Sequence, residues 1–195
     1  MDARQKMGDN LYINGEEASR IFCIEVPFSM KFLFQLSGYP LGRFVLVYGP
    51  PESCKSAMGY ELCRLHRVLG GGYSLIETEN KDSTSLRKSI VGYDDRRSSV
   101  MYVASMEEWQ AALTYQTDTV KLALDEHTIP RSVPWAFVID SIMGVNTQKV
   151  SDDIVDSGTA KIGFGHAANL MSTYMKDMTH FTDGYPLSIV GINHE

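Results

Sequence analysis

Residues 44–56 read Phe-Val-Leu-Val-Tyr-Gly-Pro-Pro-Glu-Ser-Cys-Lys-Ser, and this stretch decides which fold the chain can adopt. The apolar run 44–48 predicts a buried strand, and the apolar spacing over residues 55–69 predicts a helix. A strand, a tight loop and a helix in this order form the phosphate-binding loop of nucleoside triphosphatases. The backbone N–H groups of such a loop and the N-terminus of its helix attract anions.

The residues that we expect to contact a bound nucleotide are consecutive: Gly49, Pro50, Pro51, Glu52, Ser53, Cys54, Lys55, Ser56 and Ala57. Lys55 would reach the terminal phosphates and assist catalysis, and the Ser56 hydroxyl would ligate Mg²⁺. The usual pattern has a second Gly at the place of Cys54. A Cβ there costs roughly 1–3 kcal/mol if the backbone angle is unfavourable, and we expect the small Cys to be tolerated. The competing interpretation is a turn that only resembles a phosphate loop.

Composition narrows the class of protein. The chain has 195 residues, 44% hydrophobic and 22% charged, which is enough for one domain with a sizeable core. It contains no apolar run long enough to span a membrane and no apolar signal-peptide core near residue 1, so we expect a cytoplasmic protein without a membrane partner. Three widely spaced cysteines indicate reduced thiols. The net charge of −6 argues mildly against strong nucleic-acid affinity but permits local contacts from a loop.

Predicted strands and helices alternate along the chain. The further predicted strands are 73–78, 100–104, 135–139 and 187–192, and the further helices are 83–90, 105–127 and 165–182. Ser105 and Glu108 form a capping box at the start of one helix. Methionines at spacings of three and four in 165–182 are expected to fill the core. The alternation predicts an α/β fold in three layers, with helices on both faces of a mostly parallel central sheet.

Polar residues follow several of these strands, at the carboxyl edge where such sheets bind ligands. Asp140 would hold Mg²⁺ through water, although it could instead cap a turn. Glu79 could orient the water that attacks the γ-phosphate. Glu77 competes for this role, because strand alternation gives both glutamates the same parity. Asn193 and His194 could sense the γ-phosphate, or could simply be a polar chain end.

Several short segments, taken in order, resemble the ATPase core of the RecA family, and most closely the bacteriophage recombinases of the T-even type. These segments are residues 38–43, 47–50, the loop 49–56, 77–80, 138–141 and 192–194. The resemblance covers about residues 38–195 and implies a RecA-like P-loop NTPase core whose C-terminal part is missing. Residues 1–37 would then be a separate N-terminal segment and a candidate oligomerisation element.

The resemblance also implies a function. The chain would be an ATP- and Mg²⁺-dependent DNA recombinase core that forms a filament on single-stranded DNA and promotes homologous pairing and strand exchange. Glu79 rather than Glu77 would be the catalytic glutamate, and His194 would replace the glutamine that couples ATP to DNA binding. Residues 146–162 would form the first DNA-binding loop. Further partners would be single-stranded-DNA-binding and loader proteins, in the host cytoplasm if the chain is phage-encoded.

The sequence departs from the family in two places. Leu86 stands where the family has a Tyr that stacks on adenine, and the chain stops at Glu195, where the second DNA loop should begin, which favours a fragment. Two alternatives stay open. One is a RecA-fold ATPase with a helicase or accessory role, and the other is a non-hydrolysing nucleotide-binding interaction module.

Overall fold

The computed structural model describes residues 23–34, 38–79, 84–92, 95–146, 165–182 and 184–194. The chain divides into two compact units, Met1–Leu41 and Gly42–Glu195. In the described part of the first unit, β1 (Cys23–Ile24) pairs antiparallel with β2 (Tyr39–Pro40), and α3 (Phe28–Phe34) comes between them in sequence. The exposed rings of Phe28 and Phe32 on α3 stack with their centroids 6.1 Å apart.

The second unit is built on a five-stranded parallel sheet with strand order β3-β7-β6-β4-β5. Its strands are β3 (Arg43–Gly49), β4 (Gly72–Glu77), β5 (Ser98–Tyr102), β6 (Trp135–Asp140) and β7 (Leu187–His194). Its helices are α4 (Lys55–Val68), α5 (Thr84–Val91), the short 3₁₀ helix η2 (Asp95–Arg97), α6 (Met106–Asp125) and α8 (Gly165–Phe181). The predicted α/β class and parallel sheet are therefore confirmed.

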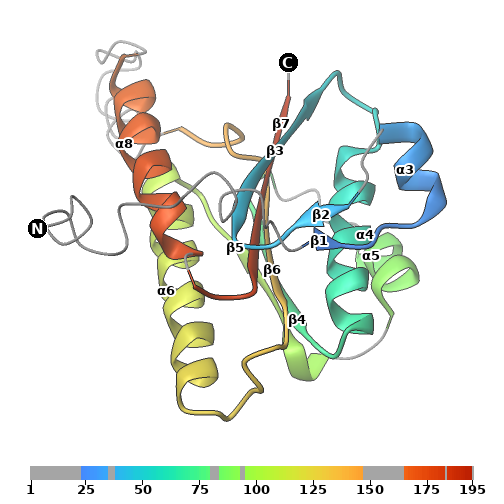
Figure 1. Ribbon diagram of the computed structural model, residues 1–195. Helices are drawn as coiled ribbons and strands as arrows, with labels where there is room; N and C mark the ends of the chain where they lie inside the picture. Colours follow the sequence, from blue (N-terminus) through green and yellow to red (C-terminus); the bar gives the residue numbers. More distant parts are fainter. Residues whose placement is uncertain are drawn as a thin grey trace, which may run out of the picture. The chain divides into compact units, whose positions relative to one another are not determined.

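Helices cover both faces of this sheet. Helices α4 and α5 lie on one side of it, and α6 and α8 lie on the other (Figure 1). Alternate residues of β6 serve the two faces: Phe137 and Ile139 belong to the core cluster that includes Trp109 of α6, whereas Val138 lies against Gly59 of α4. A sheet buried on both faces needs apolar residues at successive positions, which is what β6 supplies.

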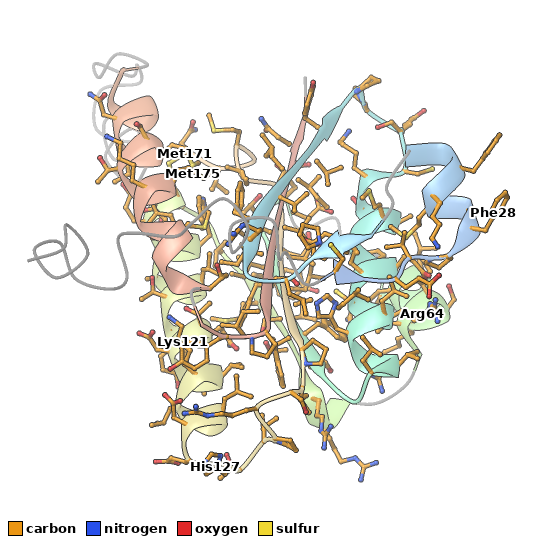
Figure 2. All side chains as sticks on the ribbon, in the orientation of Figure 1. Phe28, Arg64, Lys121, His127, Met171 and Met175 are labelled. Atoms are coloured by element: carbon orange, nitrogen blue, oxygen red, sulfur yellow. The ribbon has the colours of Figure 1, made fainter. Side chains whose placement is uncertain are left out.

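The methionines of α8 fill the core beneath that helix, as predicted. Met178 is fully buried, and Met171 and Met175 are partly buried against the same cluster. Figure 2 shows Met171 and Met175 on the side of α8 that is turned toward the sheet. None of the helices in the described ranges is long and apolar enough to cross a lipid bilayer.

Local chemistry explains the helix boundaries. Ser105 Oγ accepts a hydrogen bond from Glu108 N at 3.2 Å, and the Glu108 carboxylate accepts one from Ala104 N at 2.7 Å, so the predicted capping box is present with its return bond displaced by one residue. Helix α4 ends before Gly70, whose φ of 83° favours a residue without a Cβ.

Strands β3, β4 and β6 differ from their predicted bounds by one residue at one or both ends, and β5 and β7 differ by two. Strand β5 begins at Ser98 rather than at residue 100, because its serines pair in parallel register with β4. Strand β7 continues to His194 rather than ending at Ile192, because Asn193 and His194 pair with the last residues of β3. Asn193 and His194 are therefore the last two residues of β7 and do not lie beyond it.

Candidate functional site

The loop 49–54 joins β3 to α4 and contains two non-glycine residues in the left-handed region. Glu52 and Cys54 both have φ of 62°, and Cys54 is the residue immediately before α4. A left-handed backbone costs an L-residue about 1–2 kcal/mol, which glycine avoids. Cys54 thus occupies a conformation that suits Gly, and the structure contains the unfavourable angle on which the predicted cost depends.

Lys55 is the first residue of α4, and its amino group is turned into the loop 49–54. The side chain is only 6% exposed. Its Nζ donates hydrogen bonds to Gly49 O at 2.8 Å, Pro50 O at 2.6 Å and Ser53 Oγ at 3.3 Å. A buried ammonium group is stabilised only when such acceptors surround it. The loop therefore fixes a positive charge at the N-terminus of α4, where the helix dipole adds to the attraction for an anion.

The other predicted contact residues differ in their exposure to solvent. Gly49 is buried, Ser56 and Ala57 are partly buried, and residues 50–54 are exposed. From the end of β3 to the first turn of α4, the predicted contact residues therefore include both buried and exposed positions.

Asp140 lies at the same edge of the sheet as this loop. It is the last residue of β6, is 8% exposed, and stands in register with Ile192 of β7 on one side and Glu77 of β4 on the other. Only β7 separates β6 from β3, and Asp140 is level with Val47 across Ile192, so strand spacing and rise place Asp140 about 10 Å from Val47 and about 12 Å from Gly49. A carboxylate at this separation can share a hydrated ion and phosphate with the loop.

The two competing glutamates have different environments. Glu77 ends β4 and is 2% exposed, whereas Glu79 lies beyond the strand and is partly buried. The Ser141 hydroxyl donates a hydrogen bond of 2.7 Å to Glu79 Oε1. The parity argument does not apply to Glu79, because the strand has already ended. The structure places Glu79 in the more accessible and specifically oriented position.

A side chain that sequence reasoning missed holds this region together. Thr78 Oγ1 accepts a hydrogen bond from Ser141 N at 2.8 Å and donates one to Ser141 O at 2.7 Å, while Thr78 N donates to Asp140 O at 2.9 Å. The Asp140–Ser141 peptide bond is cis. A Cβ on Gly144 would overlap Thr78 Oγ1 and lie 2.7 Å from Glu79 Cγ. The ends of β4 and β6 are thus fixed to each other, and Gly144 is the residue that lets the chain pass over them.

A buried histidine joins α4 to β7. His66 Nδ1 donates to Leu62 O at 2.8 Å, so its Nε2 accepts the hydrogen bond of 3.0 Å from the Ser188 hydroxyl. Burial lowers the pKa of His66 to about 4, which keeps the ring neutral. On the same helix, burial raises the pKa of the Cys63 thiol and makes it a poor nucleophile. None of the three cysteines forms a disulfide.

Other predicted positions contribute less to the description. His194 pairs in register with Gly49, but the placement of its side chain lies outside the described residues. Residues 147–162 of the predicted DNA loop also lie outside them. Leu86 is exposed on α5. Within the described ranges, no group of three or more His, Cys, Asp or Glu side chains converges on a common metal position.

No model of a known protein family matches the chain, and neither does any curated protein sequence. The RecA-family resemblance therefore remains a prediction. The main features of the site are the buried Lys55 amine and the acids at the same edge of the sheet.

Proposed function

We propose that this chain binds ATP at the loop 49–54 and hydrolyses its γ-phosphate. The observation that carries the proposal is the buried Lys55 amine, held by loop oxygens at the start of α4. Phosphate oxygens would replace the carbonyl acceptors of this amine, because charge-assisted bonds to phosphate are stronger than bonds to neutral oxygens. Asp140 lies at the same edge of the sheet and supplies the acid that nucleotide hydrolysis with a metal requires.

The oxygen ligands suit Mg²⁺. Ser56 offers a hydroxyl and Asp140 a carboxylate, and Mg²⁺ is usually held by one or two carboxylates together with waters and substrate phosphates. A converging group of three protein ligands is therefore not needed. When bound there, Mg²⁺ neutralises charge that develops on the phosphates.

Glu79 is the residue that we assign to orienting the attacking water. Its carboxylate lies past the end of β4, and Ser141 fixes one of its oxygens through a bond of 2.7 Å. An oriented carboxylate can position a water molecule and accept its proton as the new P–O bond forms. Ser141 then acts as a positioning residue, because it sets the direction of the carboxylate and does not itself meet the substrate.

The RecA-family resemblance extends the proposal to an ATP-dependent recombinase core that assembles on single-stranded DNA. What supports this extension is the order of features along the chain, from the loop 49–56 through Glu79 and Asp140 to Asn193 and His194, which the sheet brings to one edge. The described residues do not include most of the predicted DNA loop, so the DNA-binding role rests on the resemblance alone.

Steady-state ATPase assays of the wild type and of Lys55→Ala test the nucleotide site. Loss of the fixed cation should reduce turnover at least about 100-fold, the effect of removing one preorganised electrostatic contact. Lys121→Ala is the matched control: it removes the same charge from α6, where Lys121 lies 5.4 Å from the ring centroid of Tyr185 (Figure 2). Unchanged turnover in Lys55→Ala would refute the site.

The same assay with single-stranded DNA separates the alternatives. Strong stimulation, with filaments visible by electron microscopy, supports the recombinase. Turnover that ignores DNA leaves an ATPase with another task. ATP binding without any turnover supports a nucleotide-binding interaction module.

A further inference from the structure

A polar cavity lies at the opposite edge of the sheet from the candidate site. It has a volume of about 330 Å³ and is lined by Arg67, Gly70, Gly71, Arg96 and Arg97. These residues come from the end of α4, the turn before β4 and the 3₁₀ helix before β5, so they lie where β4 and β5 begin. Its volume is at the lower end of the range of roughly 300–1,000 Å³ found for small-molecule sites.

Two of the three arginines that line this cavity are held by backbone oxygens. Arg67 Nη1 donates to Val91 O at 3.1 Å and to Gly92 O at 3.3 Å, and Arg97 Nη1 donates to Gly70 O. These bonds tie the guanidinium groups to the ends of α4 and α5 and reduce the conformational entropy that would be lost when a ligand binds.

The floor of the cavity is closely packed and its amides are already used. Gly70 N donates to Arg67 O at 2.9 Å, and Gly71 N donates to His66 O at 2.9 Å. A Cβ on Gly71 would overlap the carbonyl of Pro134. Recognition in this cavity must therefore come from the arginine side chains, because the backbone N–H groups of its floor have partners.

We propose that this cavity binds a phosphate group. Three arginines line one space, and their guanidinium groups do not lose their protons at any ordinary pH. Their planar donor pairs match phosphate oxygens. Among the described lining residues none is acidic and none is aromatic.

The positive charge at this cavity differs from the net charge of the whole chain. The chain as a whole has a net charge of −6, so an anion is not attracted by the molecule at large. Arg64, on the same helix as Arg67, forms an ion pair of 2.6 Å with Glu61 and does not line the cavity. The phosphate can belong to a free polyphosphate or to a nucleic-acid backbone, and binding does not depend on the nucleotide site proposed above.

Isothermal titration of tripolyphosphate into the Lys55→Ala variant tests the proposal, because that background removes the fixed cation of the other site. Adding Arg96→Ala and Arg97→Ala should weaken binding at least about tenfold, since hydrogen bonds to charged groups contribute roughly 1.5–3 kcal/mol each. The matched control adds Arg64→Ala and Arg131→Ala, which remove equal charge from two surface ion pairs outside the cavity (Arg64 is labelled in Figure 2).

Equal weakening in the control, or no weakening in the Arg96 and Arg97 variant, would overturn the proposal. Arg96→Ala alone is the second variant, because this exposed side chain can be removed with little risk to folding, and it should still weaken binding. A parallel titration with single-stranded oligothymidine identifies the source. Binding that depends on Arg96 and Arg97 assigns a nucleic-acid backbone, and binding of tripolyphosphate alone assigns a free polyphosphate.

Discussion

Acidification should destabilise this protein through His66. The ring is buried and neutral, with Nδ1 donating to Leu62 O and Nε2 accepting from Ser188, so protonation places a positive charge in the interior and forces the Ser188 hydroxyl to reverse its hydrogen bond. Its folded pKa of about 4 lies below the ordinary 6.5, so between these values the unfolded chain binds the additional proton. The His66 contribution is therefore complete above pH 6.5 and is lost as the pH falls toward 4.

The size of the loss follows from the same interval. Each pKa unit corresponds to about 1.4 kcal/mol, so lowering the pH from about 7.5 to about 4.5 should reduce the free energy of unfolding by about 2.5 kcal/mol through this group alone. Urea unfolding, followed by the fluorescence of the buried Trp109, measures the free energy at each pH.

Other groups also titrate in this range, so a matched variant is required. His66→Gln keeps a donor and an acceptor but cannot become charged. The stability difference between wild type and variant should shrink, or reverse, by about 2.5 kcal/mol on acidification, since carboxylates titrate alike in both chains. A difference that stays constant across the pH range would refute the reasoning.

Further predictions concern the loop 49–54 and the glutamates. Cys54→Gly should be about 1 kcal/mol more stable to urea than Cys54→Ala, because Ala keeps a Cβ at φ 62°; equal stabilities would show that the angle carries no cost. Ser141→Ala keeps the backbone bonds to the end of β4 but loses the bond to Glu79, so kcat for ATP should fall roughly tenfold with KM unchanged; a rise in KM alone would assign Ser141 to binding instead. Glu79→Gln should bind ATP in filter assays yet hydrolyse it slowly, while Glu77→Gln should hydrolyse at the wild-type rate. The reverse result would exchange the two roles.

Much of the fold could be predicted from local patterns. The stretch 44–56 predicted β3, the loop and α4 almost to the residue, because a short apolar run and a Gly-Pro loop are both local signals. The capping box at Ser105 fixed the start of α6 in the same way. The ends of strands were harder to predict. Strand β5 includes Ser98 and Ser99 because they pair with β4, and no local pattern in the sequence indicates a neighbouring strand.

The candidate site also has features that local sequence predicts and features that depend on contacts between distant residues. Lys55, Asp140 and Glu79 could be proposed from the strands and loop that carry them, and the sheet brings their elements to one edge. The Thr78–Ser141 bonds could not be predicted, because they join residues far apart in sequence and of common types. Ser141 directly follows Asp140, and this adjacency was the one available sign.

The cluster of Arg67, Arg96 and Arg97 was hidden for a similar reason. Arg67 of α4 meets the Arg-Arg pair of η2 only when β4 and β5 lie side by side. A charge pattern in the sequence reveals only charges that are close together along the chain, whereas the residues of this cavity come from separate elements.

The pairing of Tyr48 with Asn193 and of Gly49 with His194 has a mechanical consequence. Strands β3 and β7 are hydrogen-bonded to each other up to the residue that begins the loop, so a displacement of one strand would pull on the other. Tension applied at the end of β7 would be carried into the carbonyl of Gly49, which is one of the oxygens that holds the Lys55 amine.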